Sequence, residues 1–295
     1  MLLDKPAGIT SNAALGATKR LFQALKAGHT GTLDPFATGL LPICLGEAAK
    51  FSRFLLDADK TYRATLKLGT TTTTGDTEGE IKKICSVQLD EDSIHNVLTC
   101  FRGPRMQIPP MYSALKREGV PLYKLARQGI EIERAPRHIE IYDLQLIEWQ
   151  DDKLVIDVTC SKGTYIRVLA EEIGEALGCG AHLDALKRTA SGKLHIKQAT
   201  SLEELEDMTY SLRDELLLPA DSLAQELPEW QADRATAIGL QQGESYRLPL
   251  MILPITSAGY ARVYTEEKIF IGVVRIKQDD ATHSMVTAER MMSAV

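Results

Sequence analysis

Two reactive side chains, those of His29 and Asp34, lie in a glycine-rich stretch near the start of the printed sequence, GHTGTLDPFATG. Glycine and small hydroxyl residues allow tight turns, and the proline directly after Asp34 biases the aspartate away from helical backbone. Three interpretations stay open from these residues alone. The stretch is a plain turn, or a His-x4-Asp pair such as membrane acyltransferases use to activate a hydroxyl, or a rigid loop that presents Asp34 as a nucleophile or base.

Composition narrows the class of protein. The chain has 295 residues, of which 44% are hydrophobic and 25% are charged, which is typical of a soluble protein with one large and one small domain. A net charge of −6 excludes a uniformly basic surface but allows local basic patches that bind phosphate. From the printed residues we expect neither a membrane span nor a signal peptide. We therefore expect a cytoplasmic protein without membrane contact, which disfavours the acyltransferase interpretation.

Cysteine and histidine spacing gives no sign of a metal or a disulfide framework. The five cysteines are scattered and never form CxxC, and the six histidines include no HExxH motif. Such a pattern fits a reducing compartment and predicts neither a zinc site nor a cofactor. Asp76 and Glu78, which follow the threonine run 70–74, could form a metal-binding loop. We favour the alternative, a strand end followed by a polar turn.

A strand and two helices are expected to position the reactive residues. Residues 60–69 alternate between apolar and polar and predict a half-buried strand, with Tyr62 at its start as either a core or a cleft residue. Arg167 falls in the first turn of a predicted helix, outside its apolar stripe, where a guanidinium can pair with a carboxylate. Ser11 or Asn12 is expected to begin the other helix, whose predicted apolar face is Leu15, Thr18, Phe22 and Leu25.

Residues 106–134 differ in character, because basic residues alternate with Tyr112 and Tyr123. This mixture suits phosphate contact and base stacking, although a charged surface helix would look the same. After about residue 217 the sequence resembles a linker, and short strand candidates with glycine punctuation follow from about residue 228. The last part of the chain therefore predicts a small β domain.

Several segments of the sequence, in the order in which they follow one another along the chain, resemble the TruB family of tRNA pseudouridine synthases. The run GHTGTLDPFATGLLPICLGEAAK is similar to the family motif that holds the catalytic aspartate. The other matching segments are LLDKP, KTY, MYSALK, LYKLARQGIE, CSKGTYIR and GCGAHLDALKRTASGKL. Family members usually have several more residues before LLDKP, so we expect either a truncated start or a shortened first strand here.

The resemblance implies a function: isomerisation of uridine to pseudouridine at position 55 in the T loop of tRNA, without a cofactor or a metal. It implies that Asp34 is the nucleophile or base, that Arg167 holds it, and that Tyr62 stacks on a flipped-out uracil. The RNA-binding residues that it implies are His29, Leu186, Lys5, Lys116, Arg117, Lys124 and Arg127. Of these, Lys5 is expected to support the loop and Leu186 to supply an apolar wall.

The resemblance also implies the fold. We expect an α+β domain over residues 1–225, built on a mixed, mainly antiparallel sheet with flanking helices, and a PUA-like β domain over residues 226–295. An RNA-binding insertion is expected at about residues 105–135, and the chain is expected to be a monomer without an obligatory protein partner. The competing class is a non-catalytic tRNA-binding or chaperone protein, against which the presence of Asp34, Tyr62 and Arg167 argues.

Overall fold

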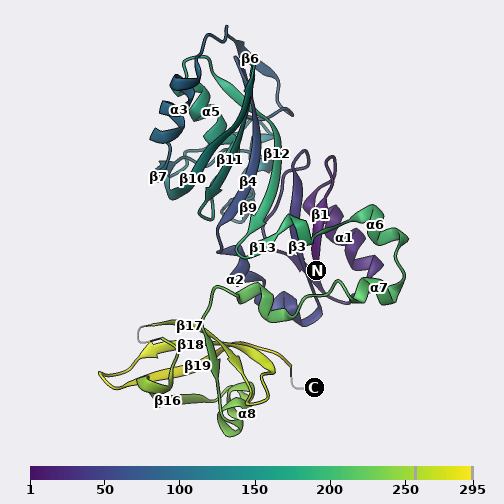
Figure 1. Ribbon diagram of the computed structural model, residues 1–295, viewed down its shortest axis with the longest axis vertical. Helices are drawn as coiled ribbons and strands as arrows, with labels where there is room; N and C mark the ends of the chain where they lie inside the picture. The colour runs from purple at the N-terminus through teal and green to yellow at the C-terminus, as the bar shows by residue number, and fades with distance from the viewer. Residues whose placement is uncertain (256–257, 294–295) are drawn as a thin grey trace.

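A ten-stranded sheet forms the larger part of the molecule (Figure 1). The computed structural model describes residues 1–255 and 258–293. Only two strand pairs, β1 with β14 and β3 with β12, are parallel within this sheet as described. The main path of the sheet is, in order, β14 (Thr200–Ser201), β1 (Leu2–Lys5), β3 (Thr38–Leu45), β12 (Ala181–Ser191), β4 (Lys60–Leu68), β11 (Lys153–Cys160), β10 (Arg137–Gln150) and β7 (Gly103–Gln107). The expected α+β class with a mixed, mainly antiparallel sheet is thus confirmed.

Two helices, α3 (Glu91–Cys100) and α5 (Ile166–Ala176), pack on this sheet and share its core. The alternation predicted for β4 is confirmed, because Ala64, Leu66 and Leu68 are buried there. Each large apolar side chain buried in this way stabilises the fold by about 1.5–3 kcal/mol. The core holds α5 against the sheet, and α5 in turn fixes Arg167 in its first turn.

The helix expected near the N-terminus is α1 (Ser11–Leu21), but its details differ from the prediction. Thr10, and neither Ser11 nor Asn12, is the N-cap, and its side chain accepts a hydrogen bond from the amide of Ala13. Leu25 is 93% exposed instead of lying on the apolar face. The reason is that Gln23 takes a φ of 48°, so the helix ends before the periodicity can carry Leu25 inward.

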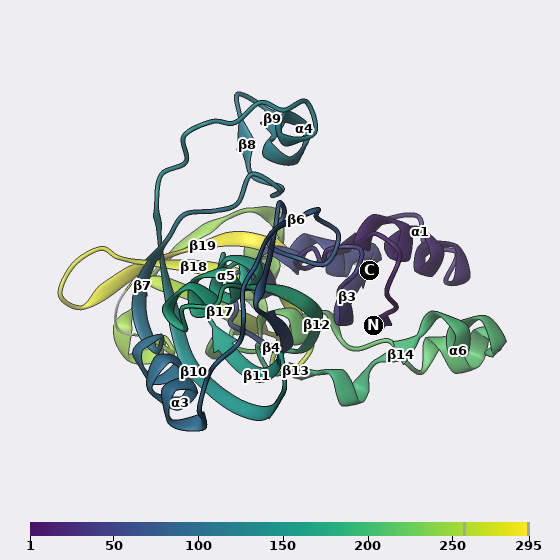
Figure 2. The same ribbon diagram turned by 90° about the horizontal axis from the view of Figure 1, so that it is seen from above.

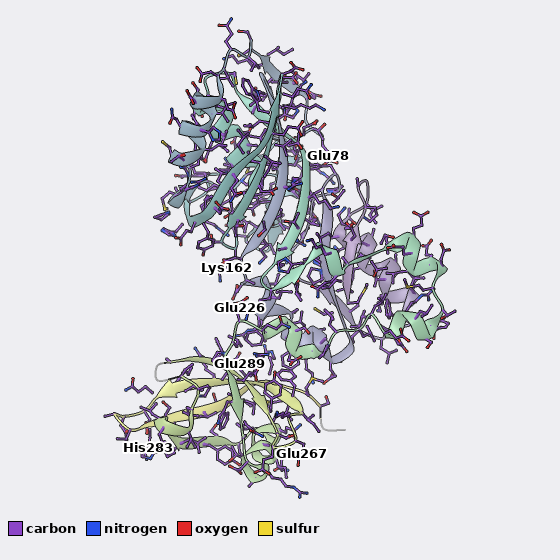
Figure 3. All side chains as sticks on the ribbon, viewed as in Figure 1. Glu78, Lys162, Glu226, Glu267, His283 and Glu289 are labelled. Carbon is purple, nitrogen blue, oxygen red and sulfur yellow. The ribbon has the colours of Figure 1, made fainter. Side chains whose placement is uncertain are left out.

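The C-terminal part forms a separate five-stranded sheet with helix α8 (Arg234–Gln242) and its own core. Its strands, in sheet order, are β15 (Glu229–Gln231), β17 (Gly259–Tyr264), β18 (Phe270–Gln278), β19 (His283–Met291) and β16 (Ser245–Pro249). The small β domain is therefore present, while a boundary at residue 226 stays a prediction. The small β domain contacts α2 (Ser52–Leu56). At this contact, Arg53 Nη1 lies 2.5 Å from Oε1 of Glu289, which is labelled in Figure 3.

The segment between β7 and β10 projects away from the large sheet (Figure 2). It contains β8 (Lys116–Arg117), β9 (Val120–Pro121) and α4 (Leu122–Ala126). The remaining elements are β2 (Ala27–His29), β5 (Thr70–Thr72), β6 (Ile81–Ile84), β13 (Leu194–His195), α6 (Leu202–Asp207), α7 (Tyr210–Asp214) and four short 3-10 helices. No helix in the described ranges combines the length and apolar character that crossing a membrane requires.

Candidate active site

A cavity of about 330 Å³ brings together four of the residues singled out in the sequence, Asp34, Tyr62, Arg167 and Leu186. They come from the loop before β3, the start of β4, the start of α5 and the middle of β12. Residues 112–114, at the base of the projecting segment, form another part of the wall. The cavity therefore lies where the edges of several elements meet the root of that segment.

The loop that carries Asp34 is held on both sides of the carboxylate. Ser11 Oγ accepts a hydrogen bond from the amide of Leu33 at 2.8 Å and donates one to the carbonyl of Leu33 at 2.9 Å. On the other side, the Gly8 amide donates to the carbonyl of Pro35 at 2.8 Å. Because neighbours on either side are tied to separate parts of the fold, Asp34 has a defined position.

Lys5 supports the same loop from beneath. Its side chain is completely buried, and its ammonium donates to the carbonyls of Pro6, Ile9 and Pro35 at 2.7, 2.8 and 3.2 Å. Burial lowers the pKa of Lys5 to about 8, and the nearby carboxylate of Asp34 opposes this shift. Lys5 does not line the cavity, so its place in the structure is that of a loop support.

Arg167 lies between two carboxylates. Its Nε is 3.1 Å from Oδ2 of Asp34, and its Nη1 is 3.3 Å from Oδ2 of Asp76. Its Nη2 also donates to the carbonyl of Tyr112 at 2.7 Å. Burial raises the pKa of Asp34, Arg167 opposes the rise, and Asp76 adds to it. The guanidinium therefore favours the ionised form of an acid whose pKa burial raises.

Asp76 is the residue that sequence reasoning missed, because it was interpreted as part of a polar turn. It is only 2% exposed, and the hydroxyl of Thr74 and the amide of Glu78 donate to its Oδ1. The turn is real, but it directs a carboxylate inward onto Arg167. A sequence signal for this contact was absent, since nothing in the spacing of GDTEG indicates which distant residue it faces.

Tyr62 and Leu186 form the half-buried part of the wall, and both pack against the main core. Tyr62 is therefore both a core residue and a cavity residue, so the two alternatives for it were not exclusive. Burial raises the pKa of Tyr62, and the positive charge of Arg188 opposes this rise. Arg188, which lines the same cavity and is 1% exposed, is a second residue that the sequence analysis did not single out.

His29 lies in β2 and is not among the residues that line the cavity. Its Nδ1 is buried and has no hydrogen-bond partner among the residues that the structure describes. Burial, and then the charge of Arg188, lower the pKa of His29, so its ring is neutral near pH 7. His29 therefore lies outside the wall of the cavity that Asp34 lines, although the two residues are close in the sequence.

The four basic residues predicted to contact RNA lie on the projecting segment, outside the cavity wall. Lys116 and Arg117 form β8, Lys124 is in α4 and Arg127 follows it. The guanidinium of Arg127 lies 5.7 Å from the centre of the Tyr123 ring. These positive charges therefore lie on the segment whose residues 112–114 form part of the cavity wall.

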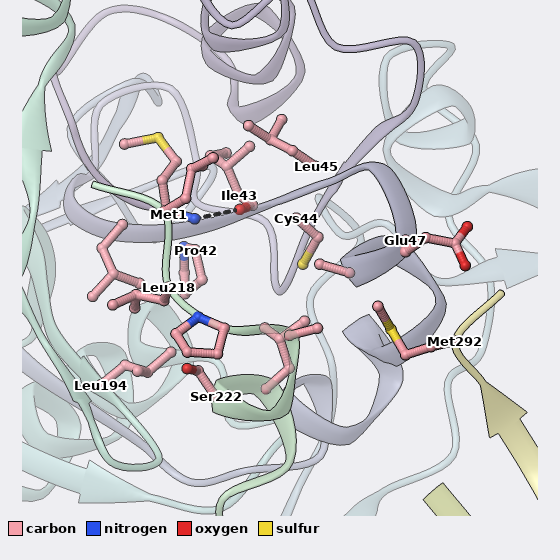
Figure 4. A pocket seen from close by; sticks show the side chains of 16 residues that line it. Met1, Pro42, Ile43, Cys44, Leu45, Glu47, Leu194, Leu218, Ser222 and Met292 are labelled. Atoms are coloured by element: carbon pink, nitrogen blue, oxygen red, sulfur yellow. Dashed lines mark hydrogen bonds between the residues drawn. The ribbon is translucent and has the colours of Figure 1, made fainter. Parts of the chain in front are cut away.

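A second cavity, of about 250 Å³, lies elsewhere, between β3 and residues 217–223 (Figure 4). Its wall is mainly apolar and includes Pro42, Leu194 and Leu218. Its lining residues include neither the paired carboxylates nor the guanidinium of the first cavity. Within the described ranges, no group of three or more histidine, cysteine or acidic side chains is arranged to hold a metal ion. The reactive groups identified here are therefore concentrated around Asp34.

Comparison with known proteins gives a consistent result along the chain. Residues 19–166 match the family model described as the TruB family pseudouridylate synthase N-terminal domain, and residues 167–225 match the tRNA pseudouridylate synthase B C-terminal domain. The tRNA pseudouridine synthase B of Dechloromonas aromatica (strain RCB) is 52% identical over 92% of this chain and 89% of that protein. The protein of the same name from Burkholderia mallei (strain NCTC 10247) is 47% identical over 99% of this chain and 96% of its own length.

Solved structures show the same similarity in three dimensions. The chain matches a protein in the crystal structure of a Cbf5-Nop10-Gar1 complex with a TM-score of 0.78 and 26% identity. That match covers 99% of this chain and 84% of the other. The likeness therefore includes the C-terminal sheet as well as the large one, in agreement with the expected PUA-like domain.

Proposed function

The chain belongs to the TruB family of pseudouridylate synthases, and as an enzyme of this family we propose that it isomerises the uridine at position 55 in the T loop of tRNA. The observation that carries the proposal is the Asp34–Arg167 pair in the wall of a cavity of about 330 Å³. The reaction breaks the bond from C1′ to N1 and forms one from C1′ to C5. A hydrogen leaves C5 and a hydrogen is gained at N1, so the composition of the nucleotide is unchanged.

Asp34 is the group that acts on the sugar. Its side chain is 38% exposed whereas that of Arg167 is 6% exposed, so the carboxylate faces the cavity with the cation behind it. An ionised carboxylate can attack C1′ or remove a proton from C2′, and both routes use the same geometry. Arg167 keeps the acid ionised and fixes its direction.

Tyr62 and Leu186 form the site for the uracil. Both line the cavity, and an aromatic ring beside an apolar side chain suits a flat base that has left its stack. We assign the phenol of Tyr62 a part in removal of the C5 hydrogen, because it lines the same cavity as Asp34. Flipping the uridine costs a few kcal/mol, and we assign His29 to the space that the base vacates.

The projecting segment supplies the RNA contacts. Lys116, Arg117, Lys124 and Arg127 lie on it, and residues 112–114 connect it to the cavity wall. RNA of defined shape is recognised largely through its backbone and its splayed bases, which basic and aromatic side chains can contact together. We propose that this segment closes on the T arm in the cytoplasm, and that the chain acts as a monomer without an obligatory protein partner.

The test is release of tritium from a T-arm stem-loop that contains uridine tritiated at C5. Pseudouridine formation expels this hydrogen, so the wild-type protein is expected to release it and Asp34→Asn is not. RNA binding without release by the wild type would favour the alternative, a tRNA-binding or chaperone protein that retains the fold. Equal release by both proteins would overturn the role of Asp34.

A further inference from the structure

Arg188 is a buried cation whose charge no carboxylate neutralises within the described part of the chain. It is 1% exposed and is the largest by volume of the fully buried side chains there. Placing an unpaired charge in the interior is costly unless hydrogen bonds compensate it. Its Nε donates to the carbonyl of Leu40 at 2.7 Å, and its Nη2 donates to the carbonyl of Gly31 at 3.0 Å. Both acceptors belong to the segment that contains Asp34.

These two acceptors mark the two ends of the loop that carries the carboxylate. Gly31 precedes Asp34 and takes a φ of +89°, and Leu40 follows it in β3. At Gly39, a Cβ would lie 2.4 Å from the carbonyl oxygen of Arg188, so β3 and β12 approach each other more closely than a side chain allows. One guanidinium therefore ties together both ends of the loop at a point of tight packing.

Arg188 also faces Tyr62. The two residues are paired across β12 and β4, and both line the cavity of Asp34. The other arginine of the cavity wall, Arg167, shares its charge with Asp34 and Asp76. Lys60, on the strand of Tyr62, directs its ammonium to the carbonyls of Leu55, Leu56 and Ala58. Of these cations, Arg188 is the one that is paired with Tyr62 across the two strands, and within the described residues it has no carboxylate partner.

The groups around the Tyr62 phenol shift its pKa in opposite directions. Burial raises the pKa of Tyr62, and Cys160 of β11 and Asp34 of the loop add to the rise. Arg188 opposes it through its positive charge. A phenol accepts a proton only after it has lost its own, so a cation beside it increases the fraction of molecules that can accept one.

We propose that Arg188 is a positioning residue of the reaction, which clamps the two ends of the Asp34 loop and supplies the positive charge against which the Tyr62 phenol ionises. This proposal rests on the pseudouridine synthase reaction proposed above. It adds a division of the cavity into two halves. One half holds the acid that acts on the sugar, with Arg167 behind it, and the other holds the phenol near C5, with Arg188 behind it.

The experiment measures single-turnover tritium release from the stem-loop between about pH 6 and about pH 10, a range that approaches the ordinary phenol pKa from below. Arg188→Gln and Arg188→Met remove the charge, and Arg188→Lys retains it. Arg213→Gln is the matched control, because Arg213 is also buried and donates to the carbonyls of Leu205, Leu21 and Glu206. Circular dichroism and RNA affinity establish that each variant is folded and binds.

For the neutral variants we expect the rate to fall by at least about tenfold throughout this range, since loss of a nearby charge shifts a pKa by about one unit or more and the phenol is mostly protonated over the whole range. Arg188→Lys, which retains the charge, should lose distinctly less of the rate. In a Tyr62→Phe background, removing the charge of Arg188 should slow the reaction distinctly less than it does beside the phenol. Arg213→Gln should leave the rate unchanged in both backgrounds.

The two proposals fail in different ways. No tritium release by the wild type would overturn the proposed reaction itself. Release by the wild type, with neutral Arg188 variants that slow the rate by the same factor in the wild-type and Tyr62→Phe backgrounds, would overturn the inference. So would an Arg188→Lys variant that is as slow as the neutral variants. Arg188→Met is a second neutral variant of similar length, and it keeps the comparison available where Arg188→Gln does not fold.

Discussion

Arg167 contacts Asp34 at 3.1 Å with its guanidinium almost fully buried and the carboxylate partly open to the cavity. The partners come from the first turn of α5 and from the loop before β3, so the contact exists only once the helix has packed on the sheet. A second carboxylate, Asp76, holds the opposite side of the guanidinium at 3.3 Å. The cation is therefore fixed by one acid and available to orient the other.

Asp34→Asn should reduce tritium release at least about a hundredfold, because the amide can neither attack C1′ nor accept a proton. The substitution preserves the shape of the side chain, so RNA affinity should stay within about threefold of wild type, a difference below about 1 kcal/mol. Affinity is measured by filter binding with the unlabelled stem-loop. Weaker binding in parallel with weaker release would show that Asp34 acts in recognition instead of in the reaction.

Asp76→Asn should destabilise the protein by about 3 kcal/mol, because it removes one partner of a buried ion pair. Asp157→Asn is the matched control, since Asp157 pairs with Arg63 more openly, and such a pair contributes about 1 kcal/mol or less. Urea unfolding of the two variants measures the difference. Tritium release by Asp76→Asn at a temperature where it is folded should also fall, since Arg167 loses its second support. Equal midpoints for the two variants would contradict the buried pair.

The rate should decrease at acidic pH, and the decrease should begin above the ordinary aspartate range. Burial raises the pKa of Asp34, so the ionised form that reacts is lost earlier as the pH falls. Arg167→Gln removes the main opposing charge and should move this decrease to still higher pH. The pH dependence of single-turnover release for the two proteins checks the shift. Coincident profiles would mean that Asp34 does not determine the acidic limb.

The same raised pKa has a consequence for stability. A carboxyl group whose pKa is higher in the folded than in the unfolded state contributes stability at low pH, and this contribution is lost as the pH rises through the folded value. Ionised Asp34 therefore costs stability at pH 7.5, and Asp34→Asn should unfold at a urea midpoint no lower than that of wild type. A clearly lower midpoint would show that the Arg167 ion pair outweighs the burial.

Alanine at Lys116, Arg117, Lys124 and Arg127 should weaken RNA binding and flatten its dependence on salt, by about one unit of slope for each phosphate that the variant no longer binds. Lys19 and Arg20, exposed on α1, provide a comparison pair for which we expect little change. Affinity across a salt series measures both sets. An unchanged slope for the first set would remove the projecting segment from the RNA-binding surface.

Local pattern determined much of the fold. The alternation in residues 60–69 predicted β4, because burial on one face of a strand imposes a period that can be read along the chain. Short strand candidates separated by glycines after about residue 228 predicted the C-terminal sheet. The end of α1 was not predictable in this way. The apolar period continues to Leu25, but the positive φ of Gln23 ends the helix first, and periodicity does not encode that conformation.

The sequence by itself singled out Asp34 in its glycine-rich loop, Tyr62 at the head of a strand and Arg167 at the head of a helix as candidates from their own surroundings. Its resemblance to the TruB family then indicated the class of chemistry. Only the tertiary structure decided which groups surround them. Asp76 looked like a turn residue, and Arg188 was one basic residue in a strand, until the sheet placed it opposite both Gly39 and Tyr62. The physical reason is that a period along the chain records which face is buried, whereas a contact between distant segments depends on strand register and helix packing.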